Sequence, residues 1–175
     1  MKKTVIVLLL SLLLSAGAFA DHPSGWGIGI VGQYNLAWDG FDGSPGLSLS
    51  LKAPQMPIYW GINVDLGKHL VGFNITGDYL IIDQPLVREV NLGWYLGLGG
   101  YVGFYKYSFE TTDWVSLRAG ARLPIGIYIV PVKFFEVFVD VAPSLGMGMY
   151  FGDYDDSFNF PEGGLGLDLG LRFWF

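Results

Sequence analysis

Apolar and polar residues alternate with a period of two along most of the chain, most clearly at its C-terminus. From Leu165 to Phe175 every odd position carries Leu or Phe, while the even positions carry Gly, Asp, Arg or Trp. Successive side chains of a β-strand point to opposite faces, so this pattern predicts a strand with one wholly apolar face. The 3.6-residue spacing of an amphipathic helix is almost absent from about residue 25 onwards.

The same alternation predicts eight strands. They cover approximately residues 25–33, 47–52, 58–65, 71–81, 92–105, 114–129, 134–144 and 163–175. An even number of antiparallel strands is what a closed barrel of the bacterial outer-membrane type requires. Pro124 and Pro143 fall inside two of these strands and are expected to mark bulges or kinks, because proline cannot donate a hydrogen bond to a neighbouring strand. In the alternative, one strand ends near Leu123 and another starts at Ile125, which breaks the count of eight.

The residues on the less apolar face separate a transmembrane barrel from a soluble β-sandwich, because strands of both kinds alternate. A soluble sandwich needs a solvated exterior rich in Lys, Glu and Thr, whereas this face carries mainly Gly, Ser, Asn and Tyr. The apolar face carries no charge at membrane depth, where a lipid-facing Arg or Lys costs about 2–4 kcal/mol. The sequence therefore predicts an all-β, eight-stranded antiparallel transmembrane β-barrel with a narrow, side-chain-filled interior, present as a monomer.

Four basic and five acidic residues fall on the face assigned to the barrel interior. They are Lys52, Arg118, Arg122 and Arg172, and Asp65, Asp78, Glu136, Asp140 and Asp168. An unpaired charge in a small barrel is costly, so these residues are expected to form an interior network of ion pairs. In the alternative, some of them lie near the rims, in water.

The first twenty residues predict a cleaved signal peptide. A basic start, Met1 to Lys3, precedes an apolar run over residues 5–14 and a small-residue cleavage site at Ala18 to Ala20. We expect residues 1–20 to be the signal peptide and residues 21–175 the outer-membrane barrel. Beyond the signal no apolar run reaches the roughly 18 residues of a transmembrane helix.

Net charge and cysteine content limit the kinds of partner and of covalent or metal site that the chain can have. The leader holds two of the ten basic side chains, which leaves eight against sixteen acidic ones and a net charge of −8 in residues 21–175. Such an acidic chain is not expected to bind nucleic acid. Without cysteine the chain has no disulfide, no thiolate metal site and no lipid-modified N-terminal Cys.

The sequence offers few residues that could form a catalytic site. The chain has two histidines, of which His22 is expected in the flexible start of the mature chain and His69 beside a short turn. No nucleophile motif accompanies His69, so we expect no enzyme activity, no catalytic residue and no cofactor. The acidic segment 153–159 lacks the central Gly and the closing Glu of a calcium loop, so a solvated acidic loop is expected there and no metal site.

The connections between strands predict which end meets the outside of the cell. With the N-terminus in the periplasm, the outer connections are residues 35–45, 66–68, 108–113 and 152–162, and the periplasmic ones are 53–57, 83–90 and 131–133. Aromatic and acidic residues gather in the last outer connection, which forms a candidate outer binding loop: Tyr150, Asp153, Tyr154, Asp155, Asp156, Phe158 and Phe160. Its aromatic residues bind a partner, cover the barrel mouth, or simply anchor the membrane interface.

Three segments carry a resemblance to a known family. Residues 122–126, 135–143 and 163–175 together resemble a family of small spirochaetal outer-membrane barrel proteins without assigned function, and the whole chain is more loosely similar to the eight-stranded OmpX, OmpA and OmpW type. The terminal Phe175, with Phe173 before it, resembles the signal by which the barrel insertion machinery recognises its substrates. The resemblance implies the fold and an outer-membrane location, with no active site to transfer.

Two functions follow as expectations. In the first, a surface-exposed structural or adhesive protein contacts an extracellular or host protein through its outer loops. In the alternative, the barrel is a narrow channel or an OmpW-like conduit for ions or small apolar molecules, lined by Tyr95, Tyr101 and Tyr105. A soluble lipocalin-like binder in the periplasm is a third possibility. For the barrel, the expected partners are outer-membrane lipid and the insertion machinery.

Overall fold

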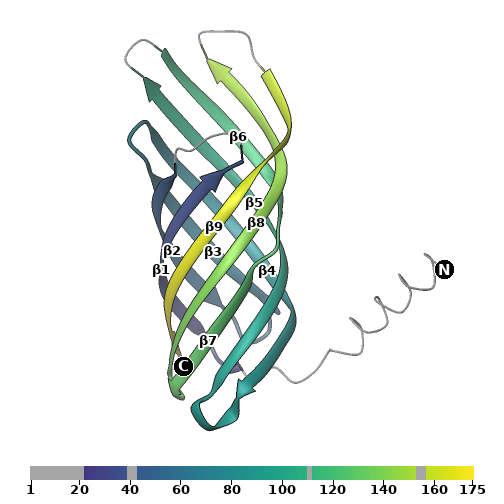
Figure 1. Cartoon of the computed structure of the whole chain (residues 1–175). Coiled ribbons are helices and arrows are strands. Elements are labelled where there is room, and N and C mark those ends of the chain that lie inside the picture. Colours follow the sequence, from purple (N-terminus) through teal and green to yellow (C-terminus); the bar gives the residue numbers. More distant parts are fainter. Residues whose placement is uncertain (1–21, 39–42, 110–111, 153–156) are drawn as a thin grey trace, which may run out of the picture.

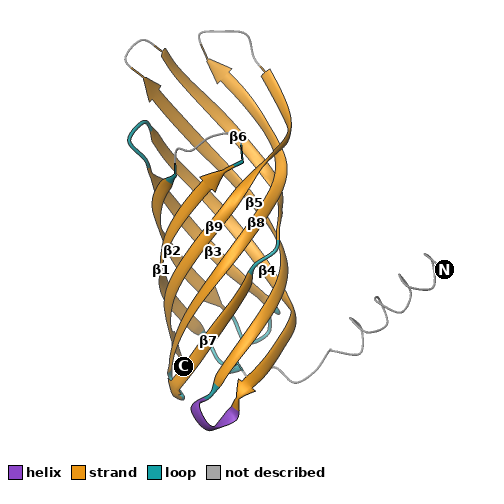
Figure 2. Cartoon of the chain, in the orientation of Figure 1, coloured by secondary structure: helices purple, strands orange, loops and turns teal. Residues whose placement is uncertain are grey.

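The computed structural model describes residues 22–38, 43–109, 112–152 and 157–175, and the predicted signal peptide lies outside these ranges. The strands are β1 (Gly27–Ala37), β2 (Ser44–Lys52), β3 (Ile58–Leu66), β4 (Leu70–Val87), β5 (Leu92–Phe109), β6 (Thr112–Arg122), β7 (Ile125–Val132), β8 (Phe135–Gly152) and β9 (Ser157–Trp174) (Figure 1). One short 3-10 helix, η1 (Arg88–Val90), joins β4 to β5 (Figure 2). Among the described residues, no helix has the length and hydrophobicity needed to cross a membrane.

The hydrogen-bonded pairings between strands run in a ring, and all are antiparallel. β1 pairs with β2, β2 with β3, β3 with β4, and β4 with β5. Both β6 and β7 pair with β5 on one side and with β8 on the other. β9 pairs with β8 and with β1. The nine strands therefore occupy eight positions in the ring, and the predicted all-β antiparallel barrel fold is confirmed.

The interruption between β6 and β7 lies at Leu123 and Pro124. Leu123 N donates to Pro143 O of β8 (2.9 Å), and Gly97 N of β5 donates to Pro124 O (2.7 Å). The two prolines thus lie beside the same gap in the ladder, where neither has an N–H to donate. A strand does end before Leu123 and another does start at Ile125, but the two segments share one position, so the predicted count of eight holds for positions in the ring.

The outward face of the ring is apolar and the inward face is polar or aromatic. In β9 the odd positions from Leu167 to Phe173 are exposed, and the even positions from Asp168 to Trp174 are buried. The same alternation is found in β2, β3, β7 and β8. Leu169 is 61% exposed, which shows how much apolar surface the ring turns outward.

The strands differ in length, and this gives the barrel two unlike ends. β1, β2 and β3 have 9–11 residues, about the number that crosses a bilayer, whereas β4, β5, β8 and β9 have 18. The β5–β6 and β8–β9 hairpins extend beyond the other strands at what we call the outer end (Figure 1). At the opposite, inner end, Trp26 and Phe175 exchange backbone hydrogen bonds of 3.1 and 2.8 Å.

Strand residues occupy part of six of the seven predicted connections, including those at 83–90 and 152–162. β4 continues to Val87, so most of the predicted connection at 83–90 is strand, with bulges between Leu80 and Ile82 and between Pro85 and Val87. β9 starts at Ser157, so the second half of the predicted outer connection at 152–162 is also strand. In both cases hydrogen bonding to β5 or β8 extends the strand past the residues where the alternation weakens.

Candidate functional site in the barrel lumen

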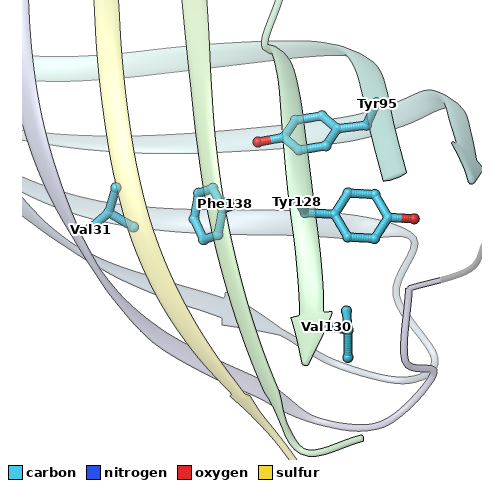
Figure 3. Packing of buried hydrophobic residues seen from close by; sticks show 5 residues of the cluster. All are labelled: Val31, Tyr95, Tyr128, Val130 and Phe138. Atoms are coloured by element: carbon cyan, nitrogen blue, oxygen red, sulfur yellow. The ribbon is translucent and has the colours of Figure 1, made fainter. Parts of the chain in front are cut away.

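Aromatic side chains fill the inner half of the lumen. Tyr95 of β5, Tyr128 and Val130 of β7, Phe138 of β8 and Val31 of β1 are buried together (Figure 3). Two of the rings lie over glycines of the neighbouring strands. A methyl group added at Gly93 would overlap the Tyr128 ring, and one at Gly170 would overlap the Phe138 ring. Glycine at these two positions allows large rings to pack flat inside a narrow barrel.

His22 also lies in the inner half of the lumen, although it precedes the first strand. Its Nδ1 is 2.6 Å from Asp83 Oδ2, and its Nε2 is 3.5 Å from Glu136 Oε1. Its ring packs on Tyr128 with a centroid distance of 3.7 Å. The expectation of a flexible start at His22 is therefore wrong, because two carboxylates and an aromatic ring hold this residue inside the barrel.

The environment of His22 favours its charged form. Burial lowers the pKa of His22, but the hydrogen bonds to Asp83 and Glu136 outweigh burial and raise the pKa above the usual value of 6.5. The positive charge of the His22 imidazolium offsets negative charge on the carboxylates of Asp83 and Glu136.

Arg172 completes the closure of the inner end. Its Nη1 donates to Glu136 Oε1 (2.7 Å), and Trp174 Nε1 donates to the other oxygen of the same carboxylate (2.7 Å). The guanidinium lies over the rings of Phe138 (4.6 Å) and Tyr59 (4.9 Å). We call the set His22, Asp83, Tyr95, Tyr128, Glu136, Phe138, Arg172 and Trp174 the inner plug.

Arg122 lies above the inner plug, among carboxylates from three strands. Its Nη2 is 3.3 Å from Asp168 Oδ2, and its Nε is 3.4 Å from Asp78 Oδ1. Asp140 faces Asp168 across the β8–β9 pair and accepts a hydrogen bond of 2.5 Å from the Tyr95 hydroxyl. The Arg122 guanidinium is therefore the one cation described in a region that holds the carboxylates of Asp78, Asp140 and Asp168.

Arg118 holds the outer half of the lumen together. Its Nε is 2.6 Å from Glu162 Oε1, and its Nη2 donates to the hydroxyls of Tyr107 (2.6 Å) and Tyr150 (2.9 Å). The Tyr105 ring lies 5.0 Å from the guanidinium. These contacts join β5, β6, β8 and β9, including the two hairpins that extend at the outer end.

Three of the nine predicted interior charges, Asp140, Asp65 and Lys52, have no ion pair among the described residues, and Asp140 has only the hydrogen bond from Tyr95. Asp65 accepts hydrogen bonds from the amides of Asn35 (2.7 Å) and Asn74 (2.9 Å). Lys52 donates to the backbone oxygens of Ala53 (2.8 Å) and Met56 (2.6 Å) in the inner β2–β3 turn. The other six form the ion pairs described above.

Three charged residues of the lumen, Asp83, Glu162 and His22, were not predicted from the sequence. Asp83 was expected in the connection at 83–90, whereas β4 continues through it; the bulge after Leu80 exchanges the two faces of β4, so this odd position points inward. Glu162 keeps the even parity of β9 and was missed because the strand was expected to start one residue later. His22 has no signal in the sequence, because it enters the lumen from outside the sheet.

Two cavities remain in the lumen. The outer one, which we call the vestibule, has a volume of about 950 Å³ and is lined by Asn35, Asp65, Tyr101, Tyr105, Tyr107, Arg118, Tyr150 and Glu162 among others. The smaller one, which we call the chamber, has a volume of about 60 Å³ and lies between the vestibule and the inner plug. Thr76, Arg122 and Asp168 line both cavities, so the two are adjacent.

The candidate outer binding loop divides into three parts. Asp153, Tyr154, Asp155 and Asp156 lie outside the described residues. Tyr150 is a β8 residue whose hydroxyl faces the lumen, where it donates to Glu162 (2.7 Å). Phe158 and Phe160 of β9 are 58% and 65% exposed at the outer end.

The predicted insertion signal lies at the inner end. Phe173 is exposed on the outward face, 5.2 Å from the Phe135 ring between centroids, and Phe175 is exposed at the end of the chain. This placement leaves both side chains accessible on the apolar surface.

The fold is similar to that of solved outer-membrane proteins. Neisserial surface protein A (NspA) is 12% identical to this chain with a TM-score of 0.53, and the match covers 86% of this chain and 97% of that one. The N-terminal β-barrel domain of OprF from Pseudomonas aeruginosa (12% identity, TM-score 0.49, 85% and 97% covered) and a major outer membrane protein from Thermus thermophilus (12%, 0.49, 86% and 98%) also match. No family model matches, and no curated protein matches by sequence.

The similarity to NspA shows the fold. The chain has the fold of a small bacterial outer-membrane β-barrel protein, as the resemblance to the OmpA and OmpX type implies. The narrower resemblance to a spirochaetal family stays a prediction.

Proposed function

We propose that this protein resides in the bacterial outer membrane as a monomeric barrel and acts at the cell surface as a binding or adhesive protein. The outward apolar face supports the membrane location. Residues such as Leu169, Val139 and Phe104 are exposed to the surroundings of the barrel, and in water they would form a continuous apolar surface far larger than soluble monomers tolerate. For the same reason a soluble periplasmic binder is a poor fit.

The main support for the proposed function is the difference between the two ends of the lumen. The inner end is closed by packed and ion-paired side chains, and the outer end opens into the vestibule. A barrel built in this way presents its accessible surface to the outside of the cell. Phe158 and Phe160 add exposed aromatic side chains to the longest outer hairpin. Aromatic residues, Phe among them, are enriched at protein interfaces relative to the rest of the protein surface.

The experiment compares bacteria that display the wild-type barrel with bacteria that display the double variant Phe158→Ser, Phe160→Ser. Loss of two aromatic contacts is expected to weaken attachment to a layer of animal cells or extracellular protein at least about tenfold. Phe134→Ser is the matched control, because Phe134 is equally exposed but lies at the inner end. Equal attachment of wild type and double variant would contradict an adhesive role for this hairpin.

A narrow channel is the second candidate, and one observation favours it. The vestibule and the chamber adjoin at Thr76, Arg122 and Asp168, so polar space extends through much of the lumen as far as the inner plug. Movement of the plug would complete a path for small ions. Ion conductance of the folded chain separates this candidate from the first.

A further inference from the structure

The chamber carries more negative than positive charge. Asp78, Asp140 and Asp168 line it, and the guanidinium of Arg122 pairs with Asp78 and Asp168. Arg172 and His22 also line the chamber, but Arg172 pairs with Glu136, and His22 pairs with Asp83 and Glu136. Three carboxylates therefore share one guanidinium at a depth where uncompensated charge is costly.

Several buried acceptor oxygens of residues that line the chamber have no donor among the described residues. Asn63 is 1% exposed. Its side-chain nitrogen donates to the backbone oxygen and to the side-chain oxygen of Asn74, and these two hydrogen bonds fix the orientation of the Asn63 amide. Asn63 Oδ1 therefore has no donor among the described residues. Gln33 is oriented in the same way, since its nitrogen donates to Asp168 (3.1 Å) and its Oε1 is left without a donor in the described part of the chain.

Two carboxylate oxygens add to this set. Asp140 is 5% exposed, and while its Oδ2 accepts from Tyr95, its Oδ1 has no donor in the described chain. Asp78 Oδ1 is buried without a hydrogen bond from the described residues and has only the longer contact with Arg122. The four oxygens come from β1, β3, β4 and β8 and belong to residues that line one cavity.

We propose that the chamber binds a small monovalent cation of the size of sodium or potassium, together with water. Oxygen atoms of carboxylates and amides are the ligands of hard cations, and about 60 Å³ has room for such an ion with one or a few waters. The cation offsets the excess negative charge and provides a partner for acceptor oxygens that lack a donor. The proposal relies on the transmembrane barrel of the proposed function but not on adhesion.

Other occupants fit these observations less well. A proton held by Asp140 and Asp168 would satisfy one acceptor and leave the oxygens of Asn63 and Gln33 without a donor. Among the described residues, no three or more His, Cys, Asp or Glu side chains are placed to hold a metal ion directly, which disfavours a tightly bound divalent ion. Organic cations exceed the volume of the chamber. Access for a small ion lies through the vestibule, past Thr76, Arg122 and Asp168.

The first test needs no variant. The folded chain in detergent is unfolded by denaturant in rising concentrations of sodium or potassium chloride, at constant ionic strength set with N-methylglucamine chloride, whose cation is too large for the chamber. Binding to the folded state alone multiplies the folding equilibrium constant by about tenfold at a cation concentration ten times its Kd. We expect this increase with sodium or potassium. An equal response to all three salts would mean that water or a proton fills the chamber, and would overturn the proposal.

The second test uses Asp140→Asn, which removes the least compensated carboxylate and keeps its shape. The variant is expected to lose most of the sodium-dependent increase and to bind less radioactive sodium at equilibrium. Asp113→Asn is the matched control, because Asp113 is an exposed carboxylate in the β5–β6 hairpin, paired with Lys106 at 3.1 Å, and its loss changes the net charge equally. An unchanged sodium response in Asp140→Asn would contradict the assignment of the site. Fractionation of cell membranes tests the membrane location separately.

Discussion

At the scale of single residues, the lumen combines neutral aromatic packing with several ion pairs. Arg172 and His22 both contact Glu136, and Arg118 contacts Glu162 and two tyrosines. Each of these cations joins segments that are not neighbours in sequence, and each contact replaces hydration that the charge loses inside the barrel. His22 is distinctive because it reaches this arrangement from a segment that takes no part in the sheet.

His22 predicts a pH dependence of stability. Since the fold raises the pKa of His22, its contribution to stability is fully present below pH 6.5 and is lost as the pH rises through the raised pKa. We expect the free energy of unfolding of the wild type in detergent to fall over that interval. His22→Gln should reduce this slope and cost about 3–5 kcal/mol at low pH, because it breaks a buried ion pair.

The control for this measurement is His69→Gln, since His69 lies at the outer end, where its Nδ1 is 3.3 Å from Ser108 O. This variant should keep the wild-type pH profile. A wild-type slope that persists in His22→Gln would assign the titration to another group.

At the scale of the strands, the alternation of exposed and buried residues was predictable, and its exceptions were not. The parity of β9 from Leu167 to Phe173 follows directly from the sequence, because one face meets an apolar environment. The bulge in β4 has no comparable signal, so the inward position of Asp83 was hidden. The pairing of both β6 and β7 with β5 and β8 depends on contacts between distant residues, which a single sequence does not encode locally.

The parity of β9 can be tested with two adjacent substitutions. Leu167→Arg places a charge on the outward face and is expected to cost about 2–4 kcal/mol if that face meets lipid. Gly166→Ala changes the neighbouring position on the other face, where an added Cβ would lie 3.4 Å from Asn35 Oδ1 and 3.6 Å from Ala142 O. The fraction of folded barrel recovered from membranes, read from its heat-dependent mobility in gels, should fall for Leu167→Arg only. Equal recovery of the two variants would contradict the assignment of the faces.

At the scale of the whole molecule, the barrel is closed at one end and open at the other. The nine charges selected from alternation were expected to be nearly balanced, but Asp83 and Glu162 add two carboxylates to the lumen and Lys52 bonds to a turn instead. The sequence therefore predicted an interior rich in charged residues. It did not predict that acidic residues outnumber basic ones there. The vestibule was also not predictable, because its volume depends on how far the hairpins extend beyond β1 to β3.

Conductance in a planar lipid bilayer tests this asymmetry. Refolded residues 21–175 are expected to be silent, because packed, ion-paired and hydrogen-bonded side chains of the inner plug fill the inner end of the lumen. Samples must first be shown to be folded by their resistance to protease. Steady, discrete channels from the folded wild type would favour the channel over the surface-binding protein.

The hydrogen bonds between Trp26 and Phe175 have a consequence for biogenesis. β1 pairs with β2 on one side and with β9 on the other. The ring therefore cannot be completed until β9 has been synthesised and exported. Until then the partly assembled sheet has two unsatisfied edges, which are prone to intermolecular pairing. Contacts between the ends of a chain also form slowly. Shortening the chain at the C-terminus by a few residues removes the Trp26–Phe175 hydrogen bonds and shortens the β1–β9 pairing, which runs from Gly27 and Trp174 to Ala37 and Gly164.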